Sequence, residues 1–360
     1  MVKQQTKTPN VEDDYYIVRE NEIIPGISLE SFIETLHKDG RSLLKLQVPK
    51  KWIRNTYISL FNKPAGDIVC PHFWELKPFI GCPFKCSYCY LQGTFFGKKE
   101  PRRKDYDKMV KVLEEFLSWA NTKGIRLLLN TGELADSLAI PSWTKEFIDK
   151  VLPILEKYKY HKVLFLSKGG TYHIKTLLEI PEDKRKYFIV SFSINPPIIK
   201  ELFEHETADP LDRLKAAKKL QELGYTVRIR IDPMIPVEGW RAHYTILVKT
   251  MFEDIGLIPE RITIGSLRGL AKTIKYSSAR NWLEYLKSGE KTRWGLKIKR
   301  ELRLDMYTIV IEKIGGYGFK GPIALCKETL DVWNELSKKG LLQHPGRYGI
   351  WENVHCNCKL

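Results

Sequence analysis

Long apolar runs are missing from this sequence, and none reaches the roughly 18–20 residues that a membrane-spanning helix needs. The first ten residues, MVKQQTKTPN, are polar, so we expect no secretory signal. Cysteine is sparse: 7 residues in 360 are too few for a disulfide scaffold, and their clustering indicates metal or redox chemistry in a reducing cytoplasm. Repeats and low-complexity segments are absent as well, and a hydrophobic content of 43% excludes a wholly disordered chain.

Acidic residues are too few to balance the basic ones. Asp and Glu number 43 against 59 Lys and Arg, which leaves a formal net charge of +16. Residues 98–104 and 266–303 hold most of this excess. The second stretch also contains four aromatic residues, Tyr276, Trp282, Tyr285 and Trp294. Bases interleaved with aromatics are typical of surfaces that bind unpaired or distorted nucleic acid. The alternative is a solvated helix face whose aromatics point into the core.

From about residue 76, short β-branched or apolar runs alternate with amphipathic stretches. The strand candidates are 76–80, 125–130, 162–167, 187–193, 226–232 and 261–265. The helical patterns are 104–120, 143–157, 171–179, 210–223 and 242–255. This alternation predicts an α/β protein with a parallel sheet inside a layer of helices, in the form of a partial (β/α)6 TIM-like barrel. We therefore expect the functional site at the C-terminal ends of the strands.

The expected domains follow from the same pattern. Residues 1–75 form an N-terminal lead-in that begins with a frayed tail over residues 1–10. Residues 76–266 form the barrel, and residues 267–360 form a basic, mostly helical C-terminal region that ends in a C-x-C tail. Both basic stretches come after strand ends, so we expect them to flank the mouth of the barrel.

The loop GCPFKCSYCYLQG carries the strongest chemical signal. It places Cys82, Cys86 and Cys89 in a C-x3-C-x2-C spacing, and thiolates are the ligands that hold iron–sulfur clusters. Three of them bind three irons of a [4Fe–4S] cube and leave the fourth iron open to a small molecule. A structural zinc site is the alternative, but it requires a fourth ligand that this loop lacks.

This loop resembles the cluster motif of the radical S-adenosylmethionine enzymes, including the aromatic Tyr88 before the third cysteine. The resemblance implies a partial (β/α)6 barrel. It also implies that S-adenosylmethionine binds the open iron and that a one-electron reductant, such as flavodoxin or ferredoxin, triggers its cleavage. The product is a 5′-deoxyadenosyl radical that abstracts a hydrogen atom from the substrate.

The resemblance also implies cofactor contacts from polar residues at successive strand ends. Besides Tyr88, these are Gly132, Glu133, Asp136, Lys168, Ser191, Ser193 and Arg230. The Gly132-Glu133 pair resembles the family's Gly-Glu element, which holds the cofactor's ammonium group. Lys168 matches a lysine that pairs with its carboxylate. The alternative for Gly132 is a plain strand-to-loop turn, and for the others a solvated strand terminus.

A narrower resemblance is to spore photoproduct lyase and the DNA-repair-photolyase-like family, through the runs CSYCYL, HETADPLDRLKAAKKLQELGY and VRIRIDP. It implies that Tyr88 and Tyr90 relay a radical back to the cofactor. In that family a cysteine three residues before a Ser-Asp pair donates a hydrogen atom to the product radical. Here Ala135-Asp136 stands in for that pair and Glu133 occupies the cysteine's place, so either the donor comes from elsewhere or the reaction differs.

Four cysteines remain outside the loop, Cys70, Cys326, Cys356 and Cys358. They suit either a second metal site or the missing hydrogen donor, for which Cys326 is our candidate. The alternatives are buried small side chains and a mobile tail. We therefore expect a cytoplasmic, lyase-like radical enzyme that acts on nucleic acid in DNA repair. Two other readings stay open: radical modification of RNA, protein or a small molecule, and a non-enzymatic iron–sulfur or zinc module that binds nucleic acid.

Overall fold

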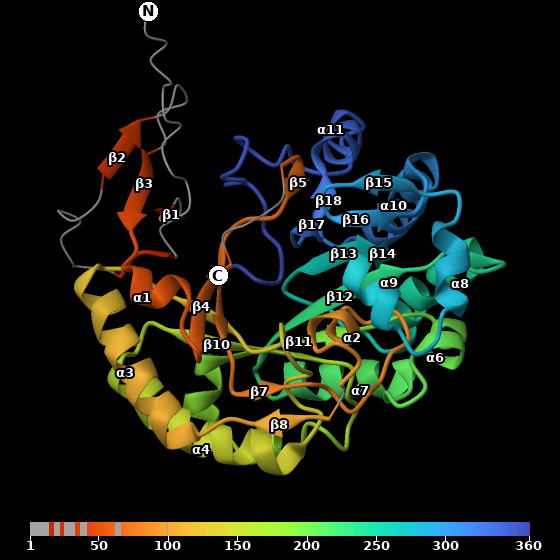
Figure 1. Cartoon of the computed structure of the whole chain (residues 1–360). Coiled ribbons are helices and arrows are strands. Elements are labelled where there is room, and N and C mark those ends of the chain that lie inside the picture. The colour runs from red at the N-terminus through yellow and green to blue at the C-terminus, as the bar shows by residue number, and fades with distance from the viewer. Residues whose placement is uncertain (1–13, 18–21, 25–32, 37–41, 62–65, 99) are drawn as a thin grey trace, which may run out of the picture.

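The computed structural model describes residues 14–17, 22–24, 33–36, 42–61, 66–98 and 100–360, so the expected frayed tail over residues 1–10 lies outside it. A curled, open sheet of eight strands forms its centre, in the order β17-β13-β12-β11-β10-β9-β6-β4 (Figure 1). All neighbouring strands are parallel except β4, which pairs antiparallel with β6 at one edge. The prediction of a partial TIM-like barrel is confirmed.

The central strands lie close to where the sequence predicts them. Their bounds are β4 Ile58–Phe61, β6 Phe73–Leu76, β9 Leu128–Asn130, β10 Lys162–Ser167, β11 Phe188–Ser193, β12 Thr226–Met234, β13 Ile262–Ser266 and β17 Ile323–Leu325. The strand expected at 76–80 is wrong in position, because it ends at Leu76. Pro78 has no N–H to give to a central ladder. The chain after it forms β7 (Phe79–Ile80), which pairs with β8 (Arg102–Arg103). β17 adds a seventh parallel strand to the six expected.

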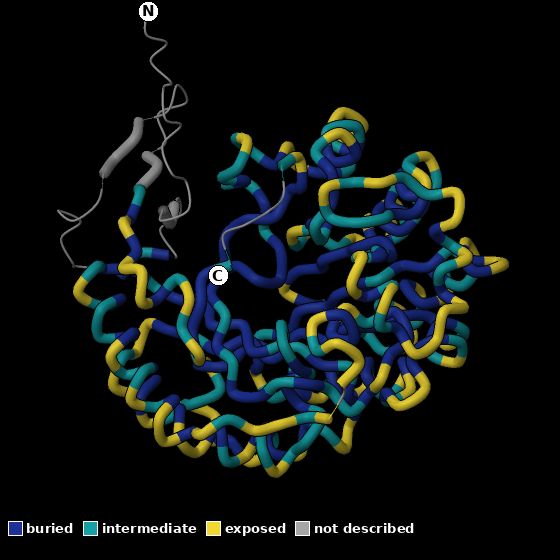
Figure 2. The backbone as a smooth tube through the Cα atoms, in the orientation of Figure 1, coloured by how far each residue is buried: buried dark blue, intermediate teal, exposed yellow. Residues whose placement is uncertain are grey.

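Helices cover the outer face of this sheet (Figure 1). They are α3 Tyr106–Thr122, α4 Pro141–Lys157, α5 Lys175–Leu178, α6 Pro197–Phe203, α7 Pro210–Glu222, α8 Trp240–Lys249 with its π-helical extension η4 Thr250–Asp254, α10 Arg300–Gly316 and α11 Leu330–Lys338. Short polar side chains begin two of them: Asp105 accepts a hydrogen bond from the backbone N–H of Lys108, and Asp209 from that of Leu211. Figure 2 shows the buried chain concentrated in the sheet and the exposed positions on the outer turns of the helices.

Alternation along β12 places polar side chains inside the barrel. On β12, the apolar Val227, Ile229 and Ile231 are buried and belong to the main core. Side chains of successive residues point to opposite faces of a strand, so the intervening Arg228 and Arg230 point into the barrel. Strand β12 therefore delivers positive charge to the interior.

The remaining elements are short. They are β1 Asp14–Ile17, β2 Ile33–Leu36, β3 Ser42–Gln47, α1 Lys50–Ile53, β5 Ile68–Val69, α2 Leu91–Thr94, η3 Glu182–Tyr187, β14 Arg268–Gly269, α9 Ala271–Tyr276, η5 Asn281–Leu286, β15 Glu290–Thr292, β16 Gly295–Lys297 and β18 Glu328–Thr329. The C-terminal region thus contains a small antiparallel sheet, β14-β16-β15, besides its helices. The predicted domain boundaries at 75 and 266 stay a prediction, although β4 and β17 join the central sheet from outside them.

The C-terminal tail enters the barrel from the side opposite the C-terminal ends of the strands. Leu360 packs against a small apolar cluster of Leu128, Leu164 and Ile189, which is separate from the main core. Asn357 is fully buried. The C-terminus lies close to β4, at the edge of the open sheet (Figure 1). Among the described residues, no helix has the length and apolar character needed to cross a membrane.

Candidate active site

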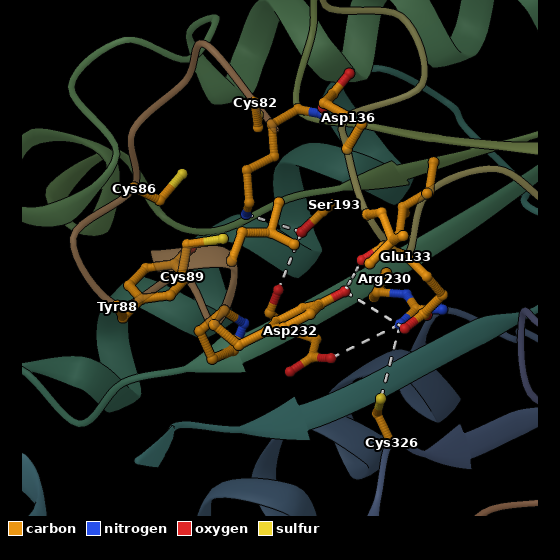
Figure 3. A pocket seen from close by; sticks show the side chains of 18 of the residues that line it. Cys82, Cys86, Tyr88, Cys89, Glu133, Asp136, Ser193, Arg230, Asp232 and Cys326 are labelled. Carbon is orange, nitrogen blue, oxygen red and sulfur yellow. Dashed lines mark hydrogen bonds and ion pairs between the residues drawn. The ribbon is translucent and has the colours of Figure 1, made fainter. Parts of the chain in front are cut away.

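A cavity of about 350 Å³ opens at the C-terminal ends of the strands. Twelve of the thirteen predicted site residues line it, namely Cys82, Cys86, Tyr88, Cys89, Tyr90, Gly132, Glu133, Asp136, Lys168, Ser193, Arg230 and Cys326. The exception is Ser191, which lies deeper in the barrel. Figure 3 shows the three loop cysteines on one side of this cavity and Cys326 on the other, with Arg230 and Asp232 between. The structure thus brings the predicted residues together, and their individual roles stay predictions.

The cysteine loop is held by close packing against Glu100 and by hydrogen bonds within its own run. Gly81 has a φ of +81°, and a Cβ there would lie 2.7 Å from the backbone oxygen of Glu100, so only glycine fits. The buried side chain of Gln92 donates to the backbone oxygens of Cys86 (2.9 Å) and Ser87 (2.7 Å). Gln92 is a residue that the sequence analysis missed, and only its place in the motif's LQG run hinted at it.

The donor set of this loop suits a cluster. All seven cysteines are free thiols, and burial raises the pKa of Cys82 and Cys86, so both thiols stay protonated until a positive group binds them. In the part of the chain that the structure describes, no three His, Cys, Asp or Glu side chains are placed to hold a single metal ion. Three loop thiols give one ligand to each of three irons, whereas a structural zinc ion needs four ligands. The donor set of the loop therefore fits a [4Fe–4S] cluster better than one zinc ion.

A buried charge network supports one wall of the cavity. Glu204, fully buried, pairs with Lys168 (2.9 Å) and Arg213 (2.8 Å) and accepts a hydrogen bond from the Tyr88 hydroxyl. Burial alone would raise the pKa of Glu204, but the two cations hold it well below its usual range. Lys168 also donates to Ser193 (2.9 Å). This network fixes the ammonium of Lys168 at the cavity wall.

Asp136 organises the loop after β9. Its carboxylate accepts hydrogen bonds from the Ser167 hydroxyl (2.8 Å), from the backbone N–H of Lys168 (2.6 Å) and from that of Leu138 (3.0 Å). Burial raises its pKa in spite of these donors. With its oxygens already occupied, Asp136 shapes the cavity wall through its neighbours.

The Gly132-Glu133 element faces two groups that the sequence did not connect with it. A Cβ on Gly132 would lie 2.5 Å from the Cβ of Leu166, so glycine allows the loop to pack on β10. The Glu133 carboxylate lies 3.7 Å from Lys327. The Tyr90 hydroxyl donates to the backbone oxygen of Glu133 and lies 3.4 Å from its carboxylate. Glu133 and Tyr90 therefore form one unit at the cavity floor.

The opposite wall is built around Arg230. Its guanidinium donates toward the sulfur of Cys326 (3.7 Å) and that of Cys358 (3.3 Å), and it lies 3.8 Å from Asp232. Both carboxylate oxygens of Asp232 accept hydrogen bonds from Arg268, at 2.8 and 2.9 Å. Burial raises the pKa of Cys326 in spite of the nearby arginines, which keeps it a neutral thiol.

The C-terminal tail completes this wall from beneath. The Asn357 side chain donates to Ser191 (2.8 Å) and accepts from Thr263 (2.7 Å), so Ser191 contacts the tail and not the cavity. Arg228 donates to the backbone oxygens of Asn357 and Lys359, both at 2.7 Å. The tail is thus an ordered part of the site, and these bonds join positions 94 to 166 residues apart.

The two basic stretches both reach the cavity side of the molecule. Arg268, Leu270 and Trp294 of the second stretch line the cavity itself. Lys98 and Arg102 of the first line a surface hollow together with Tyr276 of the second. The expected aromatic surface is only partly right, because Trp282 is fully buried and Tyr285 packs edge-on against Phe203.

Several site residues had no local sequence signal. Glu204, Arg213, Asp232, Arg268 and Lys327 all stand in or behind the cavity wall. Arg213 lies inside the HETADPLDRL run and Asp232 inside VRIRIDP, so the family resemblance pointed to their segments without assigning them a role.

Comparison with known proteins identifies a family. The family model for spore photoproduct lyase matches residues 73–267. The spore photoproduct lyase of Clostridium acetobutylicum is 26% identical over 188 residues, which cover 51% of this chain and 53% of that protein. That of Bacillus subtilis is 24% identical over 200 residues, which cover 55% of each. The match thus spans about half the length of these curated relatives.

Solved structures agree on the fold. A spore photoproduct lyase variant with bound AdoMet and dinucleoside spore photoproduct superimposes with a TM-score of 0.56 at 20% identity, covering 70% of this chain and 75% of that one. A spore photoproduct lyase complexed with dinucleoside spore photoproduct gives a TM-score of 0.55 at 21% identity, covering 69% and 74%.

Proposed function

Because the chain belongs to the spore photoproduct lyase family, we propose that it is a radical S-adenosylmethionine enzyme that reverses a lesion in DNA. The observation that carries this proposal is the cavity itself. The three cluster-loop thiols, the Lys168 ammonium and the Cys326 thiol face one space at the strand ends. Such a space holds a cluster, a cofactor and a substrate in reach of each other.

In this proposal, Cys82, Cys86 and Cys89 hold the [4Fe–4S] cluster. Lys168 and Ser193 bind the carboxylate of S-adenosylmethionine, and Glu133 binds its ammonium group. When bound, the cluster and S-adenosylmethionine would supply one-electron cleavage of a carbon–sulfur bond, which yields a radical able to remove a hydrogen atom from the substrate. The protein's own part is to orient the reactants and to exclude water from the cavity.

Cys326 is the proposed hydrogen-atom donor to the product radical. The transfer breaks its S–H bond, forms a C–H bond on the product and leaves a sulfur-centred radical. A donor must keep its hydrogen, and the raised pKa of Cys326 supports that role. Tyr90 and Tyr88 are the proposed relay: the sulfur-centred radical on Cys326 would take a hydrogen atom from a tyrosine O–H, and the tyrosyl radical would regain one from the cofactor fragment that had removed it from the substrate.

The remaining cysteines are proposed to support Cys326 and not to bind a second metal. The positively charged Arg230 lies against the sulfurs of both Cys326 and Cys358, and a guanidinium repels a metal cation at that distance. We also propose DNA as the substrate, a flavodoxin or ferredoxin as the electron donor and the cytoplasm as the location. Seven free thiols support that location, since a reducing compartment preserves them.

The test is anaerobic turnover with the dinucleoside spore photoproduct, the ligand bound by structural relatives. The reconstituted protein should cleave S-adenosylmethionine and form the repaired dinucleoside, and Cys86→Ala should do neither. Cofactor cleavage that does not depend on this lesion, but rises with an RNA, peptide or small-molecule substrate, would overturn the DNA-lesion assignment and leave the radical chemistry standing.

A further inference from the structure

A second feature on the cavity side is an aromatic pair outside the cavity. Phe96 is 57% exposed and meets the half-buried Tyr276 edge-on, with ring centroids 5.4 Å apart. Phe96 has a φ of +52°, a left-handed conformation that favours glycine. The chain therefore holds a large apolar side chain in solvent at a position where glycine would fold more easily, and strain of this kind is typical of functional sites.

Positive charge surrounds this pair. The ammonium of Lys272 lies 5.1 Å from the Phe96 ring, and that of Lys275 lies 5.3 Å from the Tyr276 ring. The adjoining hollow is lined by Lys85, Gly97, Lys98, Glu100, Arg102, Tyr276 and Ser278. Glu100 is the one carboxylate among them. Two lysines beside the rings and three basic residues in the hollow thus surround the pair. Within the described part of the chain, none of these five side chains forms an ion pair with a carboxylate.

The pair stands on a rigid base that leads to the cavity. Phe96 follows α2 by two residues and Tyr276 ends α9, and these two helices touch where a Cβ on Gly93 would lie 2.5 Å from the backbone nitrogen of Thr273. Leu91 at the start of α2 and Leu270 before α9 line the cavity. From Leu270 to Tyr276 the helix rises about 9 Å, which is about three stacked nucleotides at 3.4 Å each.

We propose that Phe96 and Tyr276, with Lys272 and Lys275, form a platform for unstacked nucleotides of the DNA strand beside the lesion. Bases have aromatic faces that stack on exposed rings whatever the sequence, and ammonium groups beside them neutralise the phosphates. A strand that enters the cavity to present its lesion must leave its duplex neighbours, so its flank is unstacked at the distance where the platform lies. This inference rests on the proposed function, because it takes the bound strand to be the flank of the substrate.

The experiment compares a long and a short substrate. Phe96→Ala/Tyr276→Ala should weaken binding of a fluorescein-labelled 12-mer of thymidine by about fivefold or more, measured by anisotropy on the cluster-loaded protein. The dinucleoside lesion does not reach the platform, so its turnover should match wild type. Tyr348→Ala removes another exposed aromatic side chain outside the platform (64% exposed) and should leave both the binding and the turnover unchanged.

Charge is tested separately by salt dependence. Lys272→Gln/Lys275→Gln should reduce the slope of log K against log salt by about 1.4, since each single-strand phosphate contact contributes about 0.7. Lys320→Gln/Lys338→Gln makes the same change in net charge away from the platform and should leave the slope as it is.

The outcomes separate this inference from the proposed function. Oligonucleotide binding that survives the aromatic double substitution overturns the platform, and so does a wild-type protein that repairs the dinucleoside but binds no oligonucleotide. Platform-dependent binding by a protein that repairs no lesion supports the platform and overturns the proposed function.

Discussion

Two walls of the same cavity are built in different ways. The cluster wall, formed by the cysteine loop with Lys168 and Glu204, rests on a short motif and a buried ion-pair network. The thiol wall, formed by Arg230, Cys326 and Cys358, joins positions 96 and 128 residues apart. In the proposed function, the cluster wall holds the cluster and cofactor, whereas the thiol wall holds the hydrogen donor that replaces the family's cysteine, whose place Glu133 occupies.

Cysteine substitutions in the two walls should differ most in their effect on iron content. Cys86→Ala should lose nearly all iron and all cofactor cleavage, because it removes one of three cluster ligands. Wild type should hold about four irons per chain. Cys358→Ala and the buried Cys70→Ala serve as matched controls and should keep that value. About eight irons in wild type, with half lost in Cys358→Ala, would make the thiol wall a second cluster site and remove the contrast.

Stability should distinguish the walls next. Glu204→Gln leaves Lys168 and Arg213 without their buried carboxylate and should lower the free energy of unfolding by about 3–5 kcal/mol. Glu146→Gln breaks the exposed pair with Arg103, whose partners are each 43% exposed, and should cost about 0–1 kcal/mol. Urea denaturation measures both. Equal losses would show that the network adds no more than a surface ion pair.

The same carboxylate predicts a pH dependence. The pKa of Glu204 is lower in the folded protein than its ordinary value of 4.5. Its contribution to stability is therefore complete above the unfolded value and is lost as the pH falls through the folded one. Below pH 4.5, the stability of wild type should fall more steeply than that of Glu204→Gln. Parallel curves would contradict the assigned charge state.

The smallest effect should come from the tail. Asn357→Ala leaves Ser191 and Thr263 without their buried partner and should cost about 1–3 kcal/mol. Iron content should stay at the wild-type value while lesion repair falls, because the tail supports the thiol wall alone. Asn281→Ala, at an exposed position, is the matched control and should change stability by less than about 0.5 kcal/mol. A loss of iron in Asn357→Ala would show that the two walls depend on each other.

Much of the cluster wall could be predicted because its signals are local. The cysteine spacing lies within one loop, and Lys168 directly follows a strand whose bounds were predicted correctly. The displaced first strand was also within reach, since Pro78 marks its end. The geometry of the thiol wall could not be predicted, because no residue pattern near Cys358 indicates that the tail lies inside the barrel against Arg230. Aromatics were ambiguous for the same reason: Trp282 and Tyr276 share one basic stretch, yet one is core and the other lines a surface hollow.

The central claim is that Cys326 donates the hydrogen atom from the thiol wall, and repair of the dinucleoside spore photoproduct in deuterated water tests it directly. The thiol exchanges its hydrogen with solvent, so wild-type product should carry deuterium. Cys326→Ala should keep its iron and its cofactor cleavage while forming little repaired product, and Cys358→Ala should still form labelled product. Labelled product from Cys326→Ala at the wild-type yield would contradict the account.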